Sequence, residues 1–284
     1  MLKFRLLTIM ATALLSLTAA RAQDASDWSA EPHTAARLIA GSLAKTANAA
    51  FLRAGVEIKL DPGWKTYWRD PGDSGVPPTF DFSGSENVKD VTVLWPAPAR
   101  FPDGAGGNSI GYLDHVILPL RVVPLDAAKP TSLQLKLAYD VCGTMCVPAD
   151  ANLKLPLTGD GAGESAVEKA EVRVPRRLAL GEGKDRGLAI LALHREPGGA
   201  HERVVVDVAA PAGAPIDLFV EGPTPEWSLP LPELIAGSAG GKGSTQQFSF
   251  DLDGLPPDAQ PKGATLTFTA VSADDAIEVP ARLD

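Results

Sequence analysis

The chain of 284 residues contains two cysteines, Cys142 and Cys146, which lie four positions apart. Two thiols at this spacing can form a structural disulfide, bind a soft metal ion, or exchange disulfides with a partner protein. A structural bond would close a very short loop, so in the chain-entropy model it would contribute only ~2 kcal/mol to stability. The spacing alone leaves all three chemistries open, because the choice among them depends on the compartment.

The segments around the cysteines predict where the pair lies. Residues 131–139 alternate polar and apolar side chains, which is typical of a half-buried strand. Asp140 and Gly143 favour a turn after that strand, and Pro148 is expected to interrupt a regular ladder. We therefore predict that the pair sits just past a strand end, with Cys146 on an irregular rim that partners can reach.

Residues 1–22 have the pattern of a secretory signal peptide. A basic start precedes an apolar stretch, residues 6–17, and Ala20-Arg21-Ala22 fits a cleavage site. The apolar stretch is shorter than the ~20 residues that a membrane span needs, and no later segment is apolar enough. The mature protein is therefore expected in an exported, oxidising compartment, without a membrane span.

Cleavage of this peptide would remove three basic residues and no acidic one, which changes the formal net charge from −9 to −12. Such an acidic protein repels nucleic acid and anionic membrane surfaces, so neither is expected as a partner. The sequence also contains no His-Glu-x-x-His zinc motif, no nucleotide-binding loop and no Gly-x-Ser-x-Gly nucleophile elbow.

Composition and patterning predict an all-β fold, because short β-type runs lie between 25 prolines and 27 glycines. About 260 mature residues exceed one ordinary domain and allow two hydrophobic cores. We expect a first domain over residues 23–160 and a linker over residues 161–185 that contains a short helix near 164–172. A second β-sandwich domain is expected over residues 186–284.

Patterns in the first half predict strands that leave two long loops. Residues 27–43 are read as extended chain or a short helix. An aromatic cluster, residues 64–68, precedes a loop over residues 69–78, and a glycine-rich loop covers residues 96–112. Long loops on rigid sheets often carry function. The predicted strands are residues 50–60, 88–95, 116–123, 133–139 and 151–157.

The second half shows no catalytic pattern. His194 and His201 flank a predicted hairpin turn and are expected to be exposed, and residues 237–243 read as a flexible loop. The predicted strands are residues 188–193, 203–208, 216–221, 246–252, 264–270 and 277–283.

Several groups of residues occur in the order found in one family. They are Trp64…Tyr67-Trp68 with Pro71-Gly72-Asp73-Ser74-Gly75, Trp95-Pro96 with Pro98, Gly111-Tyr112 with Leu118-Pro119, and Tyr139-Asp140-Val141-Cys142 with Cys146-Val147-Pro148. With these motifs, roughly residues 45–160 resemble the periplasmic N-terminal domain of the thiol:disulfide interchange protein DsbD, in the form carried by its ScsB-type relatives. The resemblance implies an immunoglobulin-like sandwich, so two such β-sandwich domains in tandem are expected.

In that family the cysteine pair relays reducing equivalents, and no cofactor is implied. Electrons come from a membrane-embedded reductase and pass to periplasmic thioredoxin-like proteins, such as disulfide isomerases, cytochrome c maturation factors or peroxide-reducing partners. The resemblance implies that Cys146 forms the mixed disulfide and that Cys142 resolves it. It also implies that Tyr67 flanks the pair and that Asp103 handles a proton.

Two features depart from the family pattern. Its best-known members separate the cysteines by more residues, and they place an aromatic cap near the position of Ala105. A Gly-Ala-Gly-Gly segment cannot shield sulfur in this way, so either another group, such as Phe101 or Tyr112, covers the pair, or the pair is less well shielded from oxidants. Full-length members also continue into a membrane domain and a thioredoxin-like domain, so this chain is expected to act as a stand-alone shuttle or as a binding module.

Two other classes of function stay open at this point. Cys142, Met145 and Cys146 are soft ligands that suit Cu(I), with His115 as a further ligand and Met10 lost with the signal peptide. The copper alternative is a periplasmic copper-binding or copper-tolerance protein. The other alternative is an interaction scaffold with an inert disulfide. Whether the protein is an enzyme is left undecided, because an electron relay is itself consumed and regenerated.

Overall fold

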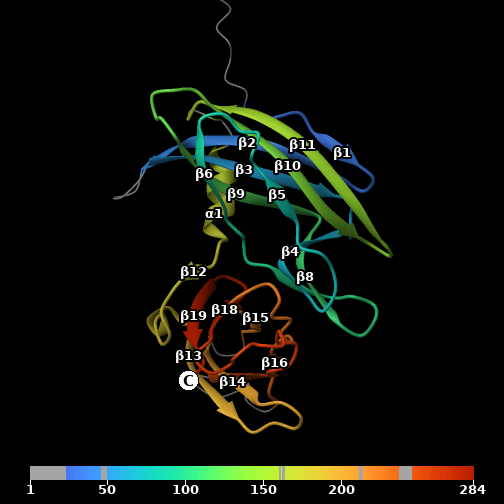
Figure 1. Cartoon of the computed structure of the whole chain (residues 1–284), viewed down its shortest axis with the longest axis vertical. Helices are drawn as coiled ribbons and strands as arrows, with labels where there is room; N and C mark the ends of the chain where they lie inside the picture. Colours follow the sequence, from blue (N-terminus) through green and yellow to red (C-terminus); the bar gives the residue numbers. More distant parts are fainter. Residues whose placement is uncertain (1–23, 46–49, 160, 162–163, 211–213, 237–244) are drawn as a thin grey trace, which may run out of the picture.

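The computed structural model describes residues 24–45, 50–159, 161, 164–210, 214–236 and 245–284 (Figure 1). Over these ranges the chain is almost entirely β-structure, and its strands form four sheets, two in each half of the chain. The predicted all-β fold is therefore confirmed. The predicted signal peptide, residues 1–22, lies outside the described residues. No helix within the described part is long and apolar enough to cross a membrane.

The first half contains two antiparallel sheets that face each other. The first sheet has the spatial order β1 (Ser29–Glu31), β2 (Thr34–Lys45), β3 (Ala50–Leu60), β9 (His115–Pro124) and β6 (Val88–Val93). The second has the order β11 (Cys146–Leu157), β10 (Thr131–Cys142), β4 (Lys65–Gly72), β8 (Asn108–Leu113) and β7 (Ala99–Pro102), and β5 (Thr79–Asp81) also pairs with β10.

The core between these sheets fixes the two strands that carry the site. Along β10, Leu133, Leu135 and Leu137 are buried and alternate with side chains on the other face, as the period of two requires. Each buried leucine contributes roughly 1.5–3 kcal/mol of hydrophobic free energy. Trp68 of β4 is the largest fully buried side chain, and it joins the same core. β4 and β10 are therefore held rigidly from their inner faces.

Helix α1 (Glu164–Val172) leads from the first half into the second and packs against β9, β2 and β3. Beyond it lie β12 (Arg176–Arg177) and a short 3-10 helix, η1 (Lys184–Arg186). The third sheet has the order β12, β19 (Ala276–Arg282), β18 (Thr265–Val271) and β15 (Asp217–Glu221). The fourth has the order β13 (Ala189–Glu196), β14 (Arg203–Ala209), β17 (Thr245–Asp251) and β16 (Glu233–Leu234). A second hydrophobic core lies between them.

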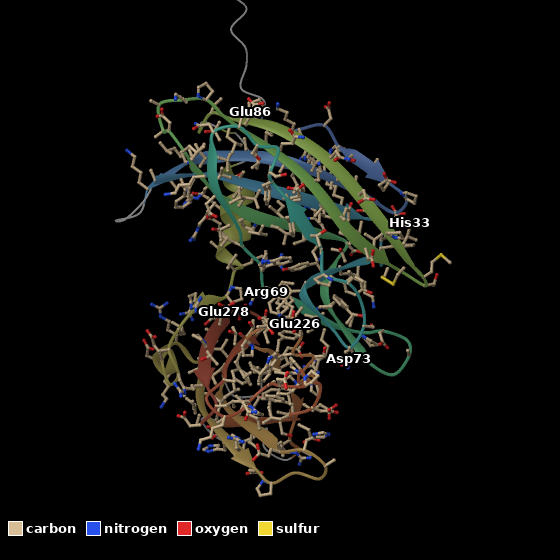
Figure 2. All side chains as sticks on the ribbon, in the orientation of Figure 1. His33, Arg69, Asp73, Glu86, Glu226 and Glu278 are labelled. Atoms are coloured by element: carbon tan, nitrogen blue, oxygen red, sulfur yellow. A yellow bond between two sulfur atoms is a disulfide. The ribbon has the colours of Figure 1, made fainter. Side chains whose placement is uncertain are left out.

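The two halves meet through an ion-pair cluster around Arg69, which lies next to Glu278 in Figure 2. The Arg69 guanidinium donates to both carboxylate oxygens of Glu221, at 2.8 and 2.7 Å, and to Glu278 at 2.6 Å. Beside it, the Phe219 ring of β15 packs against Trp68, with ring centroids 6.0 Å apart. Arg69 and Trp68 both belong to β4, so the second half contacts the strand that carries the aromatic cluster.

Two local predictions were wrong. The expected loop over residues 96–112 contains β7 and β8, which pair with each other, and β8 also pairs with β4. Pro148 does not interrupt the ladder, because it lies within β11 opposite Asp140. β11 is an edge strand, and an edge strand tolerates a proline because its outward side needs no backbone donor.

Other predictions fared better. The helix near residues 164–172 is confirmed as α1, and most of the weakly read segment 27–43 forms β2. His194 and His201 are exposed, as expected for residues beside a turn. The expected flexible loop over residues 237–243 lies outside the described residues.

Candidate functional site

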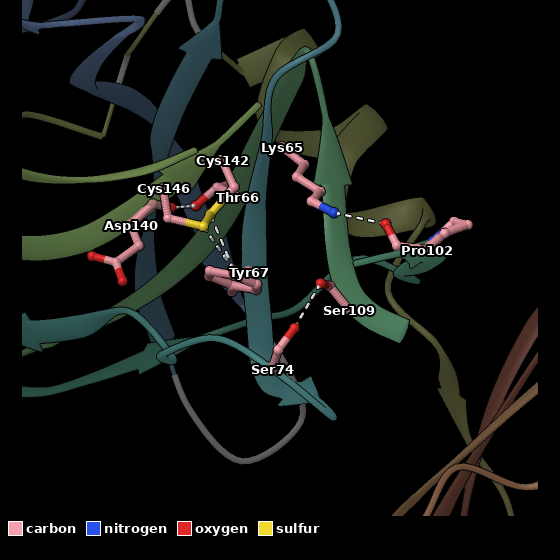
Figure 3. The surroundings of a disulfide bond; sticks show 9 residues. All are labelled: Lys65, Thr66, Tyr67, Ser74, Pro102, Ser109, Asp140, Cys142 and Cys146. Carbon is pink, nitrogen blue, oxygen red and sulfur yellow. Dashed lines mark hydrogen bonds between the residues drawn. A yellow bond between two sulfur atoms is a disulfide. The ribbon is translucent and has the colours of Figure 1, made fainter. Parts of the chain in front are cut away.

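The two cysteines form a disulfide across the tip of the β10–β11 hairpin (Figure 3). Cys142 is the last residue of β10 and Cys146 the first of β11, and the two lie directly opposite each other in the ladder. The Cys142 side chain is buried, at 2% exposure, whereas Cys146 is exposed. The prediction that the pair lies just past a strand end on an irregular rim was wrong in detail, because both cysteines are terminal residues of paired strands in a regular hairpin. One sulfur is therefore accessible and the other is shielded.

The turn that joins the cysteines rests on an aromatic pair. Any side chain at Gly143 would meet the Trp64 ring, since a Cβ there would lie 2.8 Å from the Trp64 Cε2 atom. On its other side Trp64 stacks on the His33 ring, with centroids 3.8 Å apart. His33 Nδ1 lies 2.8 Å from an Asp61 carboxylate oxygen, which fixes the imidazole. The hairpin tip is thus supported from below, and Gly143 permits the close approach.

Tyr67 contacts both sulfur atoms. Its hydroxyl oxygen lies 3.0 Å from Cys142 Sγ and 3.5 Å from Cys146 Sγ (Figure 3). Because a disulfide sulfur carries no proton, the hydroxyl is the donor in both contacts. The ring is held by Gly75, where a Cβ would lie only 2.3 Å from the Tyr67 Cε1 atom. The expected position of Tyr67 beside the pair is confirmed.

The surroundings of Tyr67 keep its hydroxyl protonated. Burial raises the pKa of Tyr67, and the negative charges of Asp140 and Asp103 raise it further, while a hydrogen bond with Ser109 partly opposes them. The phenol is therefore a hydrogen-bond donor throughout the physiological pH range. Such a donor stabilises a thiolate that forms at either sulfur when the disulfide opens.

Asp103 lies in the turn between β7 and β8. Its carboxylate accepts hydrogen bonds from the backbone N–H groups of Ala105, at 2.8 Å, and Gly107, at 3.0 Å. The Ala105 bond first, and then the Gly107 and Ser74 bonds, hold the pKa of Asp103 below its ordinary value. Asp103 is thus an anion that organises its own turn. Its charge acts on Tyr67, so it lies in the electrostatic surroundings of the site.

The two residues expected to cover the pair differ in position. Tyr112 packs in the first core and donates to the Pro96 carbonyl at 2.8 Å, so it does not cover the sulfurs. This expectation was wrong for a register reason: Tyr112 pairs with Thr66, whereas Gly111 pairs with Tyr67 and shares its face. Phe101 is half-buried on β7, and its ring lies 5.9 Å from the Lys65 ammonium. Ala105 is exposed, as expected.

The other soft or basic residues near the pair are placed as follows. Met145, in the hairpin turn, is 66% exposed. His115 lies at the start of β9, where its Nε2 atom is 3.0 Å from a Glu57 carboxylate oxygen. Within the described ranges, no group of three or more His, Cys, Asp and Glu residues is arranged to hold a metal ion.

Sequence reasoning missed two supporting residues, His33 and Gly75. Nothing in the sequence links His33 to Trp64, because His33 lies in the turn between β1 and β2, Trp64 lies just before β4, and the two rings meet only in the folded chain. Gly75 did carry a signal, since it ends the Pro71-Gly72-Asp73-Ser74-Gly75 motif. The structure requires glycine at position 75 because the backbone there has φ +120° and a side chain would overlap the ring of the buried Tyr67.

Comparisons with known proteins agree with this architecture. Residues 35–158 match the family model described as thiol:disulfide interchange protein DsbD, N-terminal. Among solved structures, the chain is similar to the N-terminal periplasmic domain of ScsB from Proteus mirabilis, with a TM-score of 0.70 and 23% sequence identity. The similarity covers 92% of this chain and 98% of that one, so both halves share the fold. No curated protein matches the sequence.

Proposed function

Residues 35–158 match the family model of DsbD N-terminal domains, and on that premise we propose that the chain relays reducing equivalents by thiol–disulfide exchange. The observation that carries the proposal is the asymmetry of the disulfide, with Cys142 buried, Cys146 exposed and the Tyr67 hydroxyl against both sulfurs. A purely structural bond needs neither an accessible sulfur nor a hydrogen-bond donor.

Reduction of the protein begins when a donor thiolate attacks Cys146 Sγ, because this sulfur faces solvent. A bond forms between the donor sulfur and Cys146, and the Cys142–Cys146 bond breaks. The electron pair of that bond goes to Cys142, which leaves as a thiolate and accepts a hydrogen bond from Tyr67. The second thiol of the donor then attacks the mixed disulfide, and both cysteines of this chain are reduced.

Oxidation follows the same path in reverse. The Cys146 thiolate attacks the disulfide of an acceptor, and the acceptor releases its other sulfur as a thiolate. Cys142 then attacks the mixed disulfide from its buried side, which restores the Cys142–Cys146 bond and frees the reduced acceptor. Each cycle moves two electrons and needs no cofactor of this chain. Asp103 is the proposed proton handler, a role that rests on the family resemblance, and its negative charge acts on Tyr67.

The proposed partners and location rest on the family and on charge. The ScsB structure is of a periplasmic domain, which supports a periplasmic site of action for this chain. The family supports a membrane-embedded reductase as donor and thioredoxin-like proteins as acceptors. We also propose the domain division at residues 161–185, since α1 lies between the sheets of the first half and those of the second, although β12 within this segment already pairs with β19.

Trapping on cysteine variants tests the relay. Cys142→Ala leaves Cys146 able to form a mixed disulfide that cannot resolve, so covalent adducts with a membrane reductase and with thioredoxin-like proteins are expected. Cys146→Ala is the matched control and should yield few adducts, because the remaining sulfur is buried.

Equilibration of the wild-type pair against glutathione adds an independent measurement. A reduction potential above about −300 mV is expected, because structural disulfides lie below that value. A lower potential, together with no adducts on Cys142→Ala, would show an interaction scaffold with an inert bond.

A further inference from the structure

A cavity of about 590 Å³ lies between α1 and the β7–β8 hairpin, away from the sulfurs. Its walls, here called the helix groove, include Phe101 and Tyr112 from the hairpin, Val116 from β9, and Ala166, Lys169 and Arg173 from α1 and the residue after it. Neither cysteine and no atom of Tyr67 lines it. Its volume falls within the range of roughly 300–1,000 Å³ that small-molecule sites occupy.

The groove exists because of what α1 presents to the hairpin. Ser165, Ala166, Lys169, Ala170 and Arg173 recur at the spacing of one helix face and line the groove together. The small side chains on this face do not reach the strands opposite, while Val167 on another face is fully buried. The Ala97 N–H donates to the Arg173 carbonyl at 2.8 Å, which ties the end of the helix to the segment before β7. The space is therefore part of a fixed framework.

The charges on the groove have one sign. Its basic lining residues are His115, Lys169 and Arg173, and no aspartate or glutamate lines it, although the chain carries a net charge of −9. His115 contacts Glu57. Neither Lys169 nor Arg173 forms an ion pair with any residue in the described part of the chain.

Arg173 lines the groove together with Tyr112, and its charge acts on that residue. Burial raises the pKa of the Tyr112 hydroxyl well above its ordinary value, and the positive charges of Arg69 and Arg173 partly oppose that rise. The groove therefore combines apolar walls with two cationic side chains that form no ion pair in the described part of the chain. Such a site complements a molecule with an apolar body and one negatively charged end.

We propose that the helix groove binds a small amphiphilic carboxylate, with its apolar tail between Phe101, Tyr112 and Ala166 and its carboxylate at Lys169 and Arg173. This site is separate from the disulfide and does not depend on thiol exchange. Binding is therefore expected to be the same in a Cys142→Ser/Cys146→Ser double variant.

Titration calorimetry with three probes of equal chain length tests the proposal. Decanoate carries the negative end, decanol is uncharged, and decylamine is cationic. We expect saturable 1:1 binding of decanoate, about tenfold tighter than decanol, because a charge-assisted hydrogen bond adds that much affinity. Decylamine should bind more weakly than decanol. Equal affinities for all three probes, or no saturable binding, would overturn the proposal.

Variants locate the site. Lys169→Gln/Arg173→Gln should lower decanoate affinity to that of decanol and leave decanol unchanged, whereas Lys129→Gln, an exposed lysine outside the groove, should change neither. Ala166→Phe should fill the groove and abolish binding of both probes. Unchanged binding in Ala166→Phe would place the probe elsewhere and refute the groove. Sedimentation of the ligand-free protein tests whether a second copy of the chain occupies the groove. If the wild type is a dimer and Ala166→Phe is a monomer, the groove is a dimer interface and the proposal is refuted.

Discussion

Tyr67 places its hydroxyl group against both sulfurs of the disulfide, and the proposed exchange depends on this contact. The hydroxyl touches both sulfurs, and its raised pKa keeps the proton on the phenol while a thiolate forms beside it. The group therefore favours the reduced state, in which a charged sulfur accepts its hydrogen bond.

Tyr67→Phe should lower the reduction potential of the pair. The ring and its contact with Gly75 remain, but the thiolate loses a hydrogen bond of about 0.5–1.5 kcal/mol, which corresponds to roughly 10–30 mV. Equilibration with glutathione at mildly alkaline pH measures the shift, and unfolding in urea checks that the fold is intact. A potential equal to that of the wild type would remove the hydroxyl from the mechanism.

Asp103→Asn separates the charge of this residue from its place in the turn. An asparagine oxygen can still accept the N–H groups of Ala105 and Gly107, so stability at neutral pH should change little. If the carboxylate accepts a proton during exchange, the rate with a small dithiol should fall and its dependence on pH should change. An unaltered pH profile would leave Asp103 as a turn residue only.

Low pH gives a second measure of Asp103. Its pKa is lowered in the folded state, so its contribution to stability is present above the unfolded pKa of ~3.9 and is lost as the pH falls through the lower folded value. The wild type should therefore lose this contribution in acid, and Asp103→Asn should not.

At the scale of elements, β4 connects the disulfide to everything that supports it. It carries Tyr67 on one face and Trp68 on the other, and it ends in the motif that returns the chain to Gly75 beneath the tyrosine ring. The position of the Tyr67 hydroxyl thus depends on Gly75, which follows β4 and lies against the tyrosine ring.

Gly75→Ala should move Tyr67 and weaken the protein. A methyl group would overlap the ring at a φ of +120°, so a loss of roughly 1–3 kcal/mol is expected, together with slower exchange. Gly104→Ala is the matched control, because Gly104 also has a positive φ but no atom within 4 Å of its Cβ position. It should cost only backbone strain. Equal losses in both variants would show that the ring contact contributes nothing.

The strands were largely predictable, whereas their irregular connections were not. Alternation of buried leucines gave β10 correctly, because one face of that strand meets the core. The sequence predicted a loop where β7 and β8 lie, since strands of four and six residues among glycines owe their structure to pairing with β4 and with each other. The cysteine pair and Tyr67 followed from motif order. The support from His33 did not, because a contact between connecting segments that are distant in the sequence leaves no local pattern.

At the scale of the whole molecule, the contact between the halves places several charges close to one another. Burial is the main cause of the raised pKa of Asp70. The Gly72 backbone hydrogen bond opposes it, and the negative charge of Glu221 in the second half adds to it. A carboxyl with a raised pKa binds its proton more readily in the folded state, so it favours folding at low pH. Stability then declines as the pH rises from the unfolded pKa of ~3.9 through the raised folded pKa.

Asp70→Asn should remove that decline. The variant keeps an oxygen for the Gly72 N–H and loses the buried charge, so it should be more stable than the wild type at neutral pH and similar to it in acid. Urea unfolding across this pH range measures the difference. Asp258→Asn, an exposed control, should follow the wild type at every pH. A constant offset for Asp70→Asn would mean that its effect is steric.

The ladder between β10 and β11 affects how much the backbone must move in the proposed cycle of reduction and oxidation of the Cys142–Cys146 pair. The two strands pair along their whole lengths, from Thr131 opposite Leu157 to Cys142 opposite Cys146, and the leucines of β10 anchor them in the core. Opening the sulfur bond therefore releases only the tip of a hairpin that the rest of the ladder keeps in register. The backbone needs little reorganisation between the oxidised and reduced forms, so a partner must distinguish them by the chemistry of the sulfurs, because the surrounding surface keeps one shape.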